Sequence, residues 1–208
     1  MGIGQNVQKF DLQLYLRSRF IDKGYKVSQI GTKKISGLFG LHPLPDFLFN
    51  TQYSDVDKVY AFNRVMKDVS MQEKPDVILL GIPDSLLPLN NKHRFSFGLY
   101  AYEIFNAVQP DFVITSLMAN DGYNDEFYSE ISKMAKYKYN VNIDAYFVSQ
   151  FCPLSNSIWS EKLSYVYLPR MEPPKTEYKV YTTSDLNNDI LFKQAEKKLL
   201  LYGKYEQY

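Results

Sequence analysis

The chain has 208 residues, of which 45% are hydrophobic, and a formal net charge of +1. This length allows one sizeable core, and the near-neutral charge gives no electrostatic case for binding nucleic acid or an anionic membrane surface. A single cysteine excludes an intramolecular disulfide, and together with only two histidines it argues against a classical zinc site. No apolar run approaches the ~20 residues that span a bilayer, so we expect a cytoplasmic protein without a membrane span.

The first 50 residues predict a helix, a strand and a packed loop. Leucine and phenylalanine recur at a spacing of four in residues 11–23, which is typical of an amphipathic helix. Residues 25–30 are rich in strand formers. Residues 37–49 are apolar but interrupted by two prolines, so we expect a packed loop with a short helical turn there.

The middle of the chain repeats a helix-to-strand pattern. Ser54 and Asp57 resemble a helix-capping pair, and the apolar spacing after them predicts a helix over 56–72. Two continuous apolar runs follow, each after a proline and an aspartate. They predict strands at 76–81 and 111–116 that are buried on both faces.

A further helix over about 125–138 and a strand at 141–148 continue the alternation. Consecutive strands at this spacing are joined by right-handed crossovers. We therefore predict an α/β fold with a mostly parallel sheet and helices on both faces, in which the four strands are adjacent.

The composition changes after residue 150, where proline and turn residues become frequent. We expect an α/β domain over 1–150 and a small carboxyl-terminal extension over 151–208. The extension contains one short strand at 164–168 and a last helix over about 185–202 that stops at Gly203.

The opening stretch, MGIGQNVQKF, comes closest to a chemical motif. In a phosphate-binding loop, glycines let backbone N–H groups converge on phosphate oxygens, a lysine reaches the outer phosphates, and a Ser or Thr hydroxyl holds Mg²⁺. Gly2 and Gly4 precede Lys9, which opens the predicted helix where that lysine would stand. Gln8 replaces the last glycine, and Phe10 stands at the hydroxyl position.

Two interpretations of this stretch stay open. One is an ordinary turn into a helix with a solvated lysine. The other is a phosphate loop that has lost hydrolysis but keeps some anion affinity at the helix start. Such loops follow a buried strand, and none precedes Gly2, so we expect the chain to be the carboxyl-terminal portion of a longer protein whose first strand is missing here.

Three blocks carry a family resemblance: GQNVQKFDLQLYLRSRFIDKGYKVSQIGTKK, LFGLHPLPDFLF and KPDVILLGIPDSLLP. In sequence and in order they resemble peptide maturation system proteins, which are accessory proteins from gene clusters for ribosomally made natural-product peptides. The likeness covers residues 2–150. It implies that the partners are a precursor peptide, short and rich in cysteine repeats, and the radical-type maturation enzyme that modifies it.

A related and larger group of P-loop proteins carries GKFT followed by GYKVGQIGTE. Its lysine corresponds to Lys9, and its threonine falls at Asp11. The likeness implies a P-loop NTPase-like domain with a degenerate phosphate site at Gly2, Gly4, Gln8 and Lys9, for which ATP or GTP with Mg²⁺ is the candidate ligand. The departures at Gln8 and Asp11 argue against hydrolysis.

Four other polar residues are candidates for a site. Asp84 follows a predicted strand, and Asn120 and Asp121 follow the next one; open α/β sheets bind ligands at these carboxyl ends. Each also has an ordinary explanation as a turn residue. His42 lies in the apolar loop and is as readily explained as a packed, hydrogen-bonded side chain.

The leading hypothesis is an accessory protein that binds a precursor peptide or its modifying enzyme. The first alternative is a nucleotide-dependent enzyme that uses Lys9, with Asp84 as a metal partner. The second is a non-catalytic scaffold with a dead nucleotide site. The sequence assigns no catalytic residue and no set of protein metal ligands.

Overall fold

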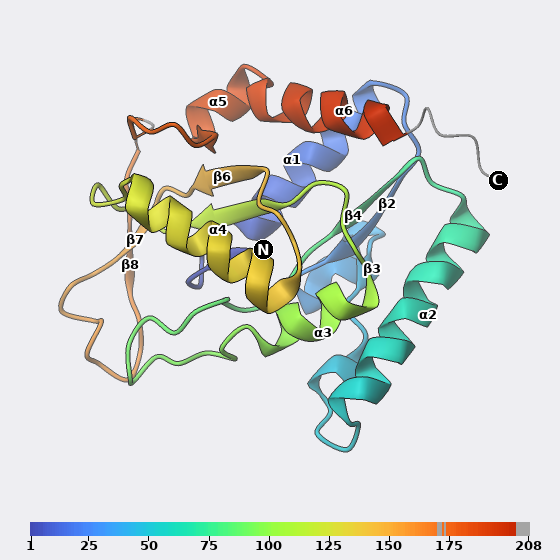
Figure 1. The fold of residues 1–208 in the computed structure, drawn as a ribbon, viewed down its shortest axis with the longest axis horizontal. Helices are drawn as coiled ribbons and strands as arrows, with labels where there is room; N and C mark the ends of the chain where they lie inside the picture. The colour runs from blue at the N-terminus through green and yellow to red at the C-terminus, as the bar shows by residue number, and fades with distance from the viewer. Residues whose placement is uncertain (170–171, 173, 203–208) are drawn as a thin grey trace. The chain divides into compact units, whose positions relative to one another are not determined.

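The computed structural model describes residues 1–169, 172 and 174–202. The chain divides into two compact units (Figure 1). The first comprises Met1–Gly4 and Gln8–Gln109, and the second comprises Gln5–Val7 and the residues from Pro110 on.

The first unit contains a parallel three-stranded sheet in the order β3-β2-β4. Val27 of β2 pairs with Val77 of β4, and Ile30 of β2 pairs with His42 of β3. The elements are β1 (Gly2–Ile3), α1 (Lys9–Asp22), β2 (Val27–Gly31), η1 (Lys34–Phe39), β3 (His42–Pro43), η2 (Asp46–Phe49), α2 (Asp55–Glu73), β4 (Val77–Leu80) and α3 (Leu99–Ala107).

The predicted helical spacing of the first unit is confirmed. The apolar residues of α1 that recur every four positions are buried, and α1 packs on β2 and β4. In α2 the buried apolar residues are Phe62, Met66 and Val69. The predicted cap of α2 is also present, since the Asp57 N–H donates to Ser54 Oγ over 3.2 Å. Such caps are typically worth about 1 kcal/mol.

The second unit contains parallel strands in the order β5-β6-β9. Figure 1 shows α4 and α6 on opposite sides of β5 and β6. Tyr128, Tyr146 and Phe147 are among its largest buried side chains. Its elements are β5 (Ile114–Leu117), α4 (Asp125–Tyr139), β6 (Ala145–Val148), β7 (Phe151–Pro153), β8 (Tyr165–Tyr167), β9 (Val180–Tyr181), α5 (Thr183–Asn187) and α6 (Ile190–Tyr202).

The α/β class and the parallel pairing are therefore confirmed, with a difference in grouping. β2 and β4 pair in one sheet, and β5 and β6 pair in another, whereas the sequence predicted all four in one sheet. Spacing along the chain predicts a parallel crossover, but it does not determine which strands share a ladder.

The domain boundary at residue 150 stays a prediction. β9, which lies in the predicted extension, pairs with β6 at Tyr146 and Val180. The predicted last helix is divided into α5 and α6, and Gly203 lies outside the described residues. Within the described part of the chain, no helix has the length and apolar character that crossing a membrane requires.

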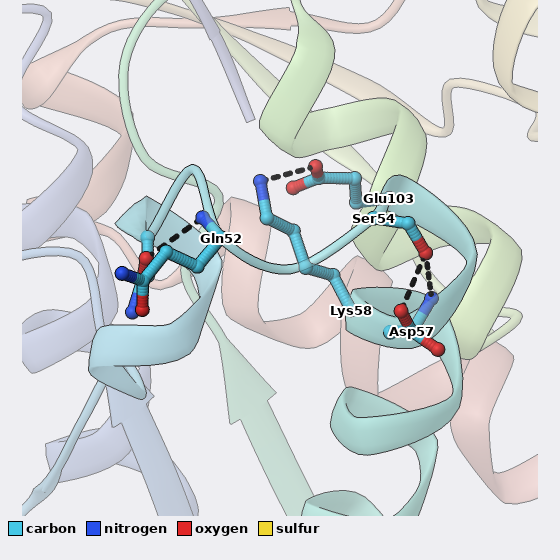
Figure 2. A network of polar contacts seen from close by, with 6 residues as sticks. Gln52, Ser54, Asp57, Lys58 and Glu103 are labelled. Carbon is cyan, nitrogen blue, oxygen red and sulfur yellow. Dashed lines mark hydrogen bonds and ion pairs between the residues drawn. The ribbon is translucent and has the colours of Figure 1, made fainter.

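A buried ion pair joins α2 to α3 in the first unit. Lys58 Nζ lies 3.1 Å from Glu103 Oε1, and the two side chains are 8% and 0% exposed. Figure 2 shows Lys58 extending toward Glu103, with Ser54 and Asp57 meeting at the start of α2. Burial raises the pKa of Glu103, the Lys58 ammonium opposes this, and the carboxyl of Asp55 adds to it.

We expect Gly31→Ala to destabilise the protein by about 1–3 kcal/mol, because overpacking displaces a fixed neighbour. A Cβ at Gly31 would lie 2.0 Å from Ser36 Oγ and 2.7 Å from Ser36 Cβ. Urea unfolding measures the change. Gly37→Ala is the matched control, since its Cβ would meet nothing within 4 Å. Adding Ser36→Gly to Gly31→Ala should restore part of the loss; a double variant no more stable than Gly31→Ala would contradict the clash.

We expect Lys58→Met to cost about 3 kcal/mol at neutral pH, because it leaves the Glu103 carboxylate buried and unpaired. The double variant Lys58→Met/Glu103→Leu should return close to wild-type stability. Because protonation relieves an unpaired buried carboxylate, the deficit of Lys58→Met should shrink as the pH falls. Urea unfolding across the acid range measures both effects, and equal losses in the single and double variants would show the explanation to be wrong.

Candidate functional site

The opening loop has an unusual backbone conformation. The φ angles are 100° at Gly4, 54° at Asn6 and 53° at Gln8. Positive φ is uncommon outside glycine. Gln8 is the N-cap residue of α1, and no side chain of the described residues caps this helix start. Residues that alternate between left-handed and other conformations turn successive N–H groups to one side, as anion-binding loops do.

The segment after β4 holds this loop in place. The Gly4 N–H donates to Ser85 Oγ over 2.7 Å, and the Leu86 N–H donates to the Gly2 carbonyl over 2.9 Å. Ser85 is fully buried, so the first of these hydrogen bonds is shielded from water. The loop is thereby fixed next to residues that leave the carboxyl end of β4.

Lys9 begins α1 and reaches the same segment. Its ammonium donates a hydrogen bond to the backbone carbonyl of Asp84. Burial lowers the pKa of Lys9 to about 8, and the Asp84 carboxylate partly opposes that shift. Lys9 is therefore a cation whose charge titrates near neutral pH, in contrast to an ordinary surface lysine.

Asp84 is brought to Lys9, but its carboxylate has a structural role. Asp84 Oδ2 accepts a hydrogen bond from the Ser96 N–H over 2.8 Å, and its φ is 57°. Phe10, at the hydroxyl position of the motif, is buried, and Asp11 is exposed. In the described part of the chain, no group of three or more His, Cys, Asp or Glu side chains is arranged to hold a metal.

Gln13 is a polar residue of this region that the sequence analysis missed. It lies one turn after Lys9, is only 9% exposed, and donates from Nε2 to the Ile30 carbonyl over 3.1 Å. Among the residues that the structure describes, none forms a hydrogen bond with its Oε1. A Cβ at Gly81 would lie 2.7 Å from that oxygen, so Gln13 fills space at the carboxyl ends of β2 and β4. The signal available in the sequence was a polar residue on the apolar face of the helix.

His42 belongs to a separate network. Its Nε2 lies 2.5 Å from Glu73 Oε1, and the Ser28 hydroxyl donates to the other oxygen of Glu73. The hydrogen bond from Ser28, more than the one from His42, lowers the pKa of Glu73. The carboxylate stands between the hydroxyl and the imidazole, so His42 is not placed to activate Ser28 as a base would in a catalytic triad.

Asn120 and Asp121 lie in the second unit and form a turn. Asn120 Oδ1 accepts from the Gly122 N–H over 2.8 Å, which is an Asx-turn contact, and Asp121 is exposed. Of the predicted candidates, the structure therefore gathers Gly2, Gly4, Lys9 and Asp84 around one loop. His42 bonds to Glu73 instead.

Comparison with known proteins adds information on the fold. No family model matches the chain, and no curated protein sequence matches it. A crystal structure of a DUF1611 family protein from Anabaena variabilis is similar, with a TM-score of 0.50 and 13% sequence identity. The match covers 72% of this chain but only 44% of that protein. At this identity the similarity supports the α/β fold and says nothing of activity.

Proposed function

We propose that this chain is an accessory protein in the maturation of ribosomally made peptides. We also propose that its opening loop binds phosphate groups without hydrolysing a nucleotide. The observation that carries the phosphate-binding part is the loop itself, with positive φ at Gly4, Asn6 and Gln8 before the uncapped start of α1. Unpaired N–H groups at a helix start attract anions, and Lys9 adds a positive charge.

Weak or absent hydrolysis is the second part of the proposal. Phe10 offers no oxygen to Mg²⁺, and the Asp84 carboxylate already accepts from Ser96. Gln8 also removes the glycine that lets the backbone close on a phosphate. Losing preorganised contacts of this kind lowers rates by roughly 100-fold or more.

The accessory role rests on the family resemblance, two of whose blocks lie together in the structure. The block from residue 4 to 34 contains the loop, α1 and β2, and the block from 74 to 88 contains β4 and the segment that holds the loop. Two of the three resembling blocks thus meet around Lys9, and the third, at residues 38–49, contains β3 and η2. The test asks whether a short cysteine-rich peptide and a radical-type enzyme are encoded beside its gene, and titrates this protein with each; absence of both genes, or binding to neither product, would remove the accessory role.

A second candidate is an enzyme that uses Lys9 on a nucleoside triphosphate, with Asp84 near the metal. The hydrogen bond between Lys9 and the Asp84 carbonyl favours it, because the bond brings the two residues together. The titration described next separates this candidate from the non-hydrolysing protein and from a scaffold that binds no nucleotide.

We expect ATP or GTP with Mg²⁺ to bind weakly, with a dissociation constant of about 0.1–1 mM, and no measurable turnover. Lys9→Ala and Lys9→Met should weaken binding about tenfold or more, because each removes a charged donor. Lys67→Ala, which removes an exposed lysine of α2, is the matched control. Micromolar binding with turnover that Lys9→Ala abolishes would establish the enzyme instead.

The affinity for ATP should fall as the pH rises from about 7 to about 9. At about pH 9, one unit above the pKa of Lys9, we expect the affinity to be about tenfold lower. The reason is that Lys9 has a pKa of about 8 and loses its charge in this range, whereas phosphate groups are already ionised. Lys9→Arg keeps its charge throughout and should show a flat profile. Calorimetric titration at each pH measures both; a flat profile in the wild type would rule out Lys9 as the contact.

A further inference from the structure

We propose that Lys33, Leu38 and Phe39, hereafter the Phe39 face, bind the base of a nucleotide whose phosphates lie on the Gly2–Lys9 loop. This inference rests on the proposed phosphate-binding function and specifies its ligand class. The ligand is a nucleoside phosphate and not a bare phosphate or polyphosphate.

An aromatic pair connects the Phe39 face to the loop. Phe10 directly follows Lys9 in α1, and its ring is buried. The Phe39 ring packs against it edge to face, with 5.9 Å between the ring centroids and 62° between the planes. Phe39 itself is 56% exposed. One of its sides is therefore supported by Phe10 while much of the ring remains open to a ligand.

The backbone holds this face in an exposed position. Ser36 is fully buried, and its Oγ donates to the Lys33 carbonyl over 2.5 Å. The missing Cβ of Gly31 allows Ser36 and Phe10 to approach the end of β2. η1 then ends at Gly40 in the left-handed conformation, at φ 66°. Leu38 is left 86% exposed beside Phe39, although burial of a leucine is ordinarily favourable.

The charges around the face select an anionic ligand. Lys33 Nζ lies 5.4 Å from the centre of the Phe10 ring, and Lys9 is the neighbour of Phe10 in the chain. A nucleotide combines a flat apolar base with negative phosphates, which complements an exposed aromatic ring whose buried partner, Phe10, lies near Lys33 and follows Lys9 in the chain. Base stacking on aromatic side chains tolerates any base, since every base has a π-face. The partnerless oxygen of Gln13, one turn beyond Lys9, is a further polar group at the same strand ends.

The test compares ATP with inorganic tripolyphosphate, each with Mg²⁺, by calorimetric titration. The wild type should bind ATP about tenfold tighter than tripolyphosphate. Phe39→Ala should remove that preference, lowering ATP affinity about tenfold and leaving tripolyphosphate affinity unchanged, and Phe39→Tyr should keep it. Phe49→Ala is the matched control, because Phe49 is also exposed and packs edge to face with Tyr100 at 5.1 Å. Circular dichroism confirms that each variant is folded.

The remaining outcomes overturn the inference. Equal affinity of the wild type for ATP and tripolyphosphate would refute the base-binding face and leave the phosphate loop intact. A preference for ATP that survives in Phe39→Ala would place the base elsewhere. Equal losses for both ligands in Phe39→Ala would show that Phe39 acts only through the loop. Binding of neither ligand by the wild type would refute both the face and the proposed phosphate binding of the loop.

Discussion

The fold around the candidate site depends on how the segment after β4 holds the start of the chain. A buried hydroxyl at Ser85, the Leu86 N–H and the Asp84 carbonyl bind Gly4, Gly2 and Lys9 in turn. These three contacts satisfy polar groups that would be costly to bury unpaired. They also determine where α1 begins and therefore where the N–H groups of its first turn lie.

The presence of Phe10 directly after Lys9 has two consequences for this region. Phe10 stands where a nucleotide-hydrolysing loop has a hydroxyl, so the position cannot bind Mg²⁺. The Phe10 ring is buried instead and packs edge to face with Phe39, while Lys33 Nζ lies 5.4 Å from the centre of the Phe10 ring. Phe10 therefore provides no ligand for Mg²⁺, and it also provides the aromatic ring against which Phe39 packs. The same residue therefore connects the two proposals, that the loop binds phosphate without hydrolysis and that Phe39 binds the base.

Much of the architecture could be predicted from the sequence, because it follows from local pattern. The spacing of apolar residues predicted α1 and α2 to within two residues at each end, and Ser54 was identified as a cap. Continuous apolar runs predicted the parallel strands β4 and β5. Hydrophobic periodicity reports which face of an element is buried, so these features needed no knowledge of distant residues.

The sequence by itself determined the α/β class, the main elements and the position of Lys9 at a helix start. Only the tertiary structure decided that strands predicted for one sheet are divided between two, and that His42 bonds to Glu73. It also decided that Lys58 and Glu103 pair although they lie 45 positions apart. The physical reason is that ladder partners, ion pairs and lowered pKa values arise from contacts between segments distant in sequence. Local propensity contains no information about those contacts.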